Sequence, residues 1–302
     1  MKYDILLIGG NGFVGRVLAA QLQAEGYSVL LPTSHLASAR ELRMLPKVHL
    51  EDADVHEFDS LQELCSRIKP NGAVINLVGV LHDKPGQPYG KVFEAAHVEL
   101  PKSIITAMQL HGLKRYLHMS ALGADSNGPS MYQRSKGDGE VAVKASNLEW
   151  TIFRPSVIFG AQDQFINLFA KLTKLFPAMP LANSGAQFQP VSVDDVASAF
   201  TKSLKMPSTI HQSYDLVGPT VYTMKEIVEF AARKVNTKCT IIPVPAFVGY
   251  LQALAFEFLP VPTLMSRDNI ASMQLPNILP FNGLDALTKV FGISRRTLEG
   301  MK

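Results

Sequence analysis

Short apolar runs alternate with helix-compatible segments along the first half of the chain. Each run is apolar enough to form a buried strand, and the segments between the runs carry apolar residues at helical spacing. The predicted strands lie at residues 4–8, 28–31, 48–55, 73–78, 115–120 and 150–153. The predicted helices lie near residues 16–22, 40–43, 59–68, 91–110 and 130–146. This regular alternation predicts an α/β fold with a doubly wound parallel sheet.

The alternation breaks after Arg154-Pro155, where helical patterns mix with proline-rich connectors. We therefore expect a Rossmann-type doubly wound domain over residues 1–160 that is rejoined by about 188–218. A smaller C-terminal lobe for a substrate or a partner is expected over 161–187 and 219–302.

Residues 191–200 predict a strand that returns to the main sheet, followed by a helix. Asp194 and Asp195 stand at the start of that helix, so we expect them to cap it rather than to act as an acid/base pair. Residues 222–236 predict a further amphipathic helix.

The most apolar part of the chain is the segment 241–265, in which four prolines interrupt the aromatic and aliphatic residues. Those prolines argue against a membrane-spanning helix. Two interpretations stay open. The segment is a buried part of the smaller lobe, or it is a surface that meets a lipid, a quinone-like ligand or a partner protein.

Composition narrows the class of protein. The chain has 302 residues, 47% of them hydrophobic and 18% charged, and a net charge of +3. With no basic stripe, nucleic acid is not an expected partner. Cys65 and Cys239 are isolated, so we expect no disulfide framework. The histidines show no ligand spacing, so we expect no metal site. We expect His97 and His118 to lie in the interior. A strand by residue 4 leaves no room for a secretory signal, so a cytoplasmic location is expected.

The glycine-rich segment after the first strand is the first candidate for chemistry. Gly9, Gly12 and Gly15 stand between a strand and a helix, with the spacing G-x-x-G-x-x-G. Gly9 would allow the sharp turn, Gly12 would let a pyrophosphate approach the backbone, and Gly15 would let the helix pack closely. The helix N-terminus then presents free N–H groups to an anion.

Tyr132 and Lys136 form the second candidate, because residues four apart on a helix project from the same face. An ammonium beside a phenol favours the phenolate, so Lys136 is expected to lower the pKa of Tyr132 for proton transfer. Ser120, at the carboxyl end of the fifth strand, is expected to hold a substrate oxygen. The carboxyl ends of parallel strands share one crevice, which would bring all three near the glycine loop.

Taken together, these segments resemble the extended and atypical short-chain dehydrogenase/reductase superfamily. More narrowly, the likeness is to the nucleotide-binding accessory subunit of respiratory complex I, of the alpha-subcomplex subunit 9 type, and its bacterial relatives. The resemblance covers nearly the whole chain. It rests on Gly9–Gly15, 74–79, 118–124, 132–136, 154–160, 190–197 and 266–270.

The resemblance implies roles for individual residues. The three glycines would bind the pyrophosphate, Asp54 and Val55 would flank the adenine, and Tyr132 and Lys136 would reach the nicotinamide ribose. The catalytic candidates are Ser120, Tyr132 and Lys136. The cofactor-binding candidates are Gly9, Gly12, Phe13, Val14, Gly15, Arg16, Ser34, Arg40, Asp54, Val55, Leu77, Val78, Gly79, Tyr132, Lys136 and Pro155.

The segment after the second strand bears on the choice of cofactor. It reads Thr33-Ser34-His35 and lacks the acid that would bind a free ribose 2′-hydroxyl. Arg16, Arg40 or Arg43 could instead pair with a 2′-phosphate. NADP(H) is therefore favoured over NAD(H).

Three functions stay open at this level. The first is an oxidoreductase that acts on a carbonyl, an alcohol or a quinone-related substrate through Tyr132, Lys136 and Ser120. The second is a non-catalytic, nucleotide-holding accessory or assembly protein of respiratory complex I or of quinone metabolism, peripheral at the inner face of a membrane. The third, a sugar-nucleotide epimerase or dehydratase, rests on superfamily analogy alone.

Overall fold

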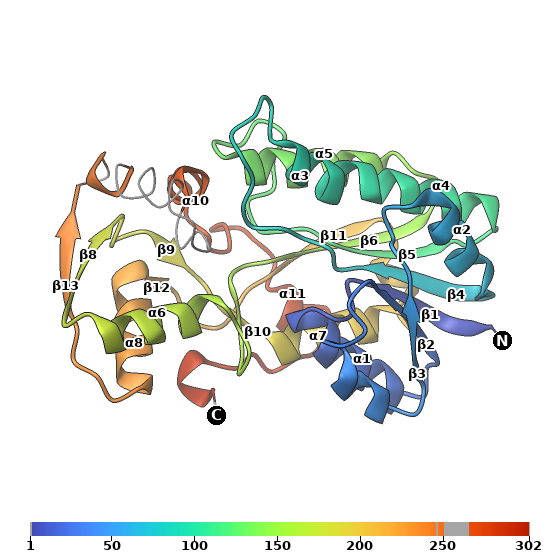
Figure 1. Ribbon diagram of the computed structural model, residues 1–302, viewed down its shortest axis with the longest axis horizontal. Coiled ribbons are helices and arrows are strands. Elements are labelled where there is room, and N and C mark those ends of the chain that lie inside the picture. Colours follow the sequence, from blue (N-terminus) through green and yellow to red (C-terminus); the bar gives the residue numbers. More distant parts are fainter. Residues whose placement is uncertain (1, 246, 251–265, 302) are drawn as a thin grey trace.

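A computed structural model describes residues 2–245, 247–250 and 266–301. Its centre is a seven-stranded parallel sheet with the strand order β11-β6-β5-β4-β1-β2-β3 (Figure 1). The strands are β1 (Tyr3–Ile8), β2 (Val29–Thr33), β3 (Val48–Asp52), β4 (Ile68–Asn76), β5 (Arg115–Met119), β6 (Glu149–Pro155) and β11 (Gln212–Leu216). The predicted α/β fold with a doubly wound sheet is confirmed.

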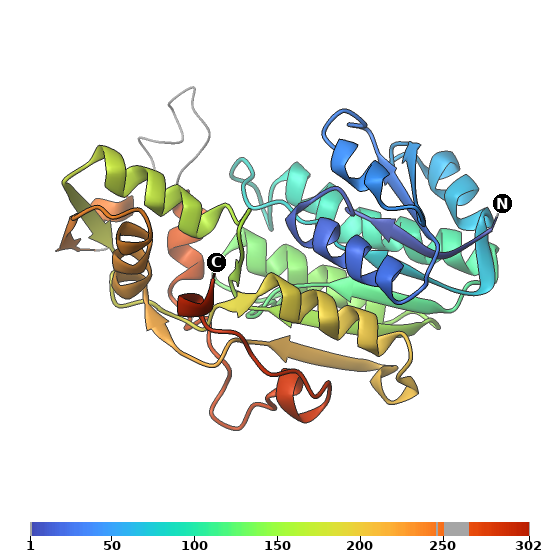
Figure 2. The same cartoon turned by 90° about the horizontal axis from the view of Figure 1, so that it is seen from below.

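Helices cover both faces of this sheet (Figures 1 and 2). One face packs against α1 (Phe13–Ala24), α7 (Val193–Ser203) and α11 (Ala286–Lys289). The other packs against α2 (Phe58–Ser66), α4 (Leu100–Leu110) and α5 (Met131–Lys144). A parallel sheet buried on both faces needs continuous apolar strands, and Leu6, Leu7 and Ile8 of β1 are accordingly all 0% exposed.

The helix expected over 91–110 is continuous but changes its winding. It begins as α3 (Lys91–Phe93), widens into the π-helical segment η2 (Glu94–Glu99) and continues as α4. Pro101 lies in the first turn of α4, where its missing N–H removes a helical hydrogen bond to the preceding turn. The π-helical segment places His97, 1% exposed, in the interior beside α5.

Residues 191–200 differ from the expectation. β10 (Val191–Ser192) pairs with β7 (Ile158–Phe159) outside the main sheet, and β11 is the strand that returns to it beside β6. The N-cap of α7 is Ser192, whose hydroxyl accepts from the Asp194 N–H. Asp194 and Asp195 are not caps, because both already lie in the first helical turn, where each contacts Arg296.

The remaining elements build the smaller lobe at the left of Figure 1 and several short connections. The lobe has its own apolar core between α6 (Phe165–Leu175), α8 (Met224–Lys234) and β8 (Ala178–Ala182). Its other elements are β9 (Gln187–Phe188), β12 (Tyr222–Thr223), β13 (Thr240–Val244) and α10 (Arg267–Ser272). The 3₁₀ turns are η1 (Arg40–Met44), η3 (Pro207–Thr209) and η4 (Leu298–Gly300).

Of the apolar segment 241–265, the structure describes 241–245 and 247–250, and the rest lies outside the described residues. Phe247 and Tyr250 are 67% and 46% exposed, whereas Ile241 packs against the lobe core, so the described part of the segment is only partly buried. Among the described residues, none of the helices has the length and apolar character needed to cross a membrane.

Candidate functional site

The strand order reverses between β1 and β4, whose carboxyl ends therefore open a crevice at a topological switch point. The glycine loop follows β1, and Leu77–Gly79 follow β4. Ser120 and Pro155 stand at the carboxyl ends of β5 and β6. The topology therefore brings the predicted residues from separate parts of the sequence to one edge of the sheet.

The glycine loop is built as its spacing predicts. Gly9 has a φ of +77°, a left-handed conformation that favours glycine. A Cβ on Gly15 would lie 2.5 Å from the Gly10 Cα, so only glycine lets α1 pack this closely on the loop. A Cβ on Gly12 would meet only the Gly9 carbonyl oxygen, at 3.3 Å. The side of Gly12 away from that carbonyl is thus open to a ligand.

The N-terminus of α1 has no capping side chain among the described residues. Its N-cap is Gly12, and the first turn has no acidic residue. The first N–H groups of a helix have no intrahelical acceptor, and they carry partial positive charge. This end of α1 is therefore suited to an anion such as a pyrophosphate.

Lys136 lies beneath the opposite wall of the crevice. It is 3% exposed, and its Nζ donates to the carbonyl oxygens of Val78 at 3.4 Å and Met119 at 3.3 Å. A Cβ on Gly79 would come within 3.3 Å of the same Nζ, so Gly79 keeps the ammonium open to the crevice. Burial lowers the pKa of Lys136 to about 8, although the nearby Glu140 carboxylate acts to raise it.

Tyr132 differs from the expectation about its acidity. Its ring packs edge-on against Phe93 and His97, with centroid separations of 6.0 and 5.6 Å. Burial raises the pKa of Tyr132 to about 12, whereas Lys136 was expected to lower it. The reason is that the Lys136 ammonium is directed to two backbone carbonyls and forms no hydrogen bond to the phenol. At neutral pH, Tyr132 is a protonated phenol that can donate.

Ser120 and His118 share the face of β5 that is covered by α5. Ser120 is 4% exposed and close enough to Glu140 to help lower its pKa, yet its Oγ has no hydrogen bond of normal geometry within the described residues. His118 Nδ1 lies 3.2 Å from the Tyr116 hydroxyl, while its Nε2 is buried without a partner. The predicted interior position of His118 is confirmed. His97 is also interior, and both of its ring nitrogens have hydrogen-bond partners.

Glu140 and Arg154 are the most important site residues that the sequence analysis did not predict. Glu140 is 2% exposed and accepts two hydrogen bonds from Arg154, at 2.7 and 2.5 Å, and one from Lys144 at 2.8 Å. Burial raises the pKa of the Glu140 carboxyl, but these hydrogen bonds outweigh burial and lower it overall. A signal existed, because Glu140 follows Lys136 at helical spacing and faces the same side of α5.

Asp268 is a second residue that the sequence reasoning did not place in the site. Its two carboxylate oxygens accept from the backbone N–H groups of Met131, at 2.6 Å, and Tyr132, at 3.0 Å. The smaller lobe thereby caps the helix that carries Tyr132 and Lys136. Nothing in the sequence indicates this contact between residues so far apart along the chain.

Arg16 sits beside the carboxyl end of β2. Its guanidinium donates to Asn11 Oδ1 and to Glu41, each at 3.0 Å. No acidic residue ends β2, where Thr33 and Ser34 stand. Arg40 is exposed on η1 and forms no ion pair among the described residues. Within the described residues, no group of side chains could hold a metal ion.

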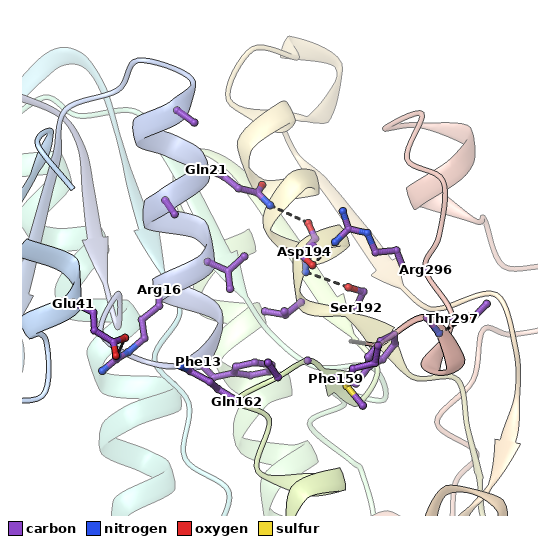
Figure 3. A pocket seen from close by; sticks show the side chains of 18 residues that line it. Phe13, Arg16, Gln21, Glu41, Phe159, Gln162, Ser192, Asp194, Arg296 and Thr297 are labelled. Atoms are coloured by element: carbon purple, nitrogen blue, oxygen red, sulfur yellow. Dashed lines mark hydrogen bonds and ion pairs between the residues drawn. The ribbon is translucent and has the colours of Figure 1, made fainter. Parts of the chain in front are cut away.

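A cavity of about 830 Å³ lies behind the glycine loop rather than in the crevice (Figure 3). It runs between α1 and α7 and is closed by the C-terminal residues 296–301. The Phe13 ring lies here, with its Cζ 3.0 Å from where a Cβ on Gly160 would stand. The Phe13 ring therefore lies in this cavity and not in the switch-point crevice.

Fold and crevice together define a doubly wound dinucleotide-binding protein. More narrowly, residues 5–217 match the model of the NAD dependent epimerase/dehydratase family. The chain therefore belongs to this family and is an NAD(P)-binding domain of the epimerase/dehydratase type.

Individual relatives give two further comparisons. "NADH dehydrogenase [ubiquinone] 1 alpha subcomplex subunit 9, mitochondrial" of Arabidopsis thaliana is 29% identical over 292 residues, covering 92% of this chain and 71% of that protein. The mouse protein of the same name is 27% identical over 280 residues, covering 91% and 72%. Among solved structures, "Crystal structure of gox2253" superposes with a TM-score of 0.73 at 19% identity, covering 97% and 93%, which shows the fold alone.

Proposed function

We propose that this protein binds NADP(H) across the switch-point crevice. The observation that carries the proposal is the uncapped N-terminus of α1, which faces a crevice whose other wall is kept open by Gly79 above Lys136. The helix end fits the pyrophosphate, and the ammonium fits the hydroxyls of the nicotinamide ribose. Asp54 and Val55, which follow β3, are proposed to flank the adenine.

The preference for NADP(H) over NAD(H) is supported by the surroundings of β2. A free ribose 2′-hydroxyl is usually bound by an acid at this strand end, and none is present. Arg16 is already held there by Asn11, and its partner Glu41 is 77% exposed by side chain. A 2′-phosphate could therefore replace the carboxylate on the guanidinium, with Ser34 and Arg40 close along the chain.

Calorimetric titration with NADPH and NADH tests this preference. A charge-assisted hydrogen bond contributes about 1.5–3 kcal/mol, so NADPH should bind at least about tenfold more tightly than NADH. Arg16→Leu should remove most of that difference, whereas Arg233→Leu, at an exposed position of α8 in the smaller lobe, should keep it. Equal affinities in the unchanged protein would contradict the NADP(H) proposal while leaving dinucleotide binding intact.

We further propose that the bound nucleotide is held rather than turned over, as in an accessory or assembly subunit of a respiratory complex. Similarity to the subunit 9 proteins over nine-tenths of the chain supports this use. The raised pKa of Tyr132 and the burial of Ser120 against α5 also support it, because neither group is placed as a ready proton acceptor. A cytoplasmic location at a membrane surface is part of this proposal.

An oxidoreductase is the second candidate, favoured by Tyr132 and Lys136 on one helix face at the crevice. A bound reduced nicotinamide supplies a hydride to a carbonyl carbon or a quinone, and the protonated Tyr132 phenol donates a proton to the oxygen. The family description also keeps a sugar-nucleotide substrate open.

Two measurements separate holding from turnover. Under the holding proposal, nucleotide identified by mass spectrometry survives dialysis, and NADPH is not oxidised by quinones, ketones or sugar nucleotides. Turnover that Tyr132→Phe abolishes without changing NADPH affinity would overturn the holding proposal and establish the enzyme.

A further inference from the structure

The outer end of the smaller lobe carries a two-stranded sheet with exposed apolar residues on one face. β8 and β13 form a two-stranded parallel sheet at the far left of Figure 1. Met179 and Leu181 of β8 are buried in the lobe core, whereas Pro180 and its register partner Ile242 are exposed. Ala182, which shares this face of β8, is buried beside Gly249, so the exposed part of the face is the part around Pro180 and Ile242. Parallel sheets are normally covered on both faces, so apolar residues exposed there indicate a surface that meets something else.

Exposed apolar side chains continue at the start of this sheet. Leu175 and Phe176, at the end of α6, are 71% and 48% exposed, and Ile242 is 48% exposed. The Thr240 N–H donates to the Pro177 carbonyl at 2.9 Å, which sets the start of β13 directly beside the chain that leaves Phe176. These side chains protrude from a helix end and a flat strand pair.

Lysines surround this apolar surface without acidic partners. Lys171, Lys174 and Lys238 are exposed, and none of them forms an ion pair within the described residues. The Thr237 and Thr173 hydroxyls lie 3.5 Å apart, which brings the loop of Lys238 to the last turn of α6. The sequence has no Asp or Glu over 164–193 or over 230–256. We call Lys171, Lys174, Leu175, Phe176, Lys238 and Ile242 together the lobe face.

We propose that the lobe face docks on a membrane surface that contains anionic phospholipids. Protruding apolar groups among uncompensated lysines match the boundary between acyl chains and phosphate headgroups, where long lysine stems extend toward the phosphates. An apolar protein groove would leave the lysines without partners. The inference goes beyond nucleotide binding and does not depend on it.

Flotation with lipid vesicles tests the proposal on the full chain. Binding is expected to vesicles of phosphatidylcholine with about one-third phosphatidylglycerol, and to weaken strongly for phosphatidylcholine alone. Each lysine near an anionic surface contributes roughly fivefold, so replacing Lys171, Lys174 and Lys238 by Gln should weaken binding by about 100-fold. Leu175→Ser with Phe176→Ser should weaken it about tenfold or more, at any salt concentration.

Matched controls lie at the other end of the molecule, where Leu110 is 62% exposed at the end of α4 and Lys114 is exposed before β5. Leu110→Ser and Lys114→Gln should leave vesicle binding unchanged.

All variants should retain NADPH affinity, which shows that they fold and separates this test from that of the proposed function. No binding to anionic vesicles, or an equal loss in the controls, would overturn the proposal. Loss of co-purification with a membrane complex without any vesicle binding would assign the lobe face to a protein partner and also overturn it.

Discussion

The two helices that begin at the crevice, α1 and α5, have opposite arrangements at their N-termini. α5 is closed by the protein itself, through a capping box of Ser130 and Gln133 and through the Asp268 carboxylate. α1 has Gly12 as its N-cap, with no acid in its first turn and no capping side chain among the described residues. Every helix start needs acceptors for its N–H groups, so the difference teaches that α1 leaves its acceptors to a ligand.

The charged groups on the inner face of α5 are also compensated by other groups of the protein. Lys136 and Glu140 are both buried, and Arg154 from β6 closes the Glu140 carboxylate. Groups that the protein satisfies itself contribute to stability, whereas groups left open contribute to ligand affinity. Changes in α5 and changes in α1 should therefore affect different measurements.

Glu140→Gln should have the largest effect, because it leaves Arg154 without its buried counter-charge. Breaking a buried pair costs about 3 kcal/mol or more, so we expect this loss in the free energy of unfolding measured with urea at pH 7. Glu140→Gln combined with Arg154→Met should cost less than the sum of the two single changes. Additive losses would show that the pair is not coupled.

Gly12→Asp would give the N-terminus of α1 a carboxylate acceptor, as Asp268 does for α5. The Gly12 φ of −76° suits any residue at an N-cap, and an added Cβ is tight only against the Gly9 carbonyl oxygen, at 3.3 Å, so stability should change by less than about 1 kcal/mol. The added carboxylate faces the proposed pyrophosphate, and such like-charge contacts cost several kcal/mol, so the Kd for NADPH should rise about 100-fold. Gly12→Ser, a cap without charge, should weaken binding much less. An unchanged NADPH affinity for Gly12→Asp would show that the pyrophosphate does not bind at this helix end.

Asp268→Asn should remove part of the N-terminal capping of α5, because an amide offers only one acceptor oxygen for the two N–H groups. We expect a loss of about 1 kcal/mol in the free energy of unfolding and a change of less than about twofold in NADPH affinity. Asp59→Asn is the matched control, since Asp59 is an exposed acid in the first turn of α2. A loss of NADPH affinity larger than the loss of stability would make Asp268 part of the ligand site.

The pH dependence of NADPH affinity should show the smallest effect. The pKa of Lys136 is lowered to about 8, so its ammonium loses the proton as the pH rises from 7 to 9, and the Kd should increase roughly fivefold. The groups that face Lys136 do not titrate in this window. Burial lowers the pKa of His97 and His118, the latter to about 3, and the pKa of Glu140 is also lowered. The Lys136→Met variant should bind NADPH more weakly, with a Kd that stays constant between pH 7 and 9. A Kd that still rises with pH would assign the pH dependence to another group.

Much of the fold could be predicted from the sequence because its strands are short, continuous apolar runs. Strands such as β1 and β2 are buried on both sides, so their positions need no knowledge of their neighbours. β11 was not recognised as a strand of its own. Its run, Gln212–Leu216, includes the polar residues Gln212, Ser213 and Asp215, which an edge strand tolerates.

The candidate site was predicted in position but not in its electrostatics. Local spacing identified Gly9, Gly12 and Gly15, since the backbone requirements of a tight turn are local. The spacing of Tyr132 and Lys136 placed them on one helix face, but it could not show how deeply each would be buried. Burial dominates both pKa values and reverses the expectation for Tyr132.

The sequence by itself determined the order of the first six strands and of the helices between them, the glycine turn, and the position of Tyr132 and Lys136 on one helix face. These follow from periodicity and backbone sterics, which act over a few residues. Only the tertiary structure decided that Asp268 closes α5, that Arg154 compensates Glu140, and that α1 begins without a cap beside Gly79 and Lys136. Those contacts join residues far apart in the chain, and their energies depend on how fully water is excluded between them.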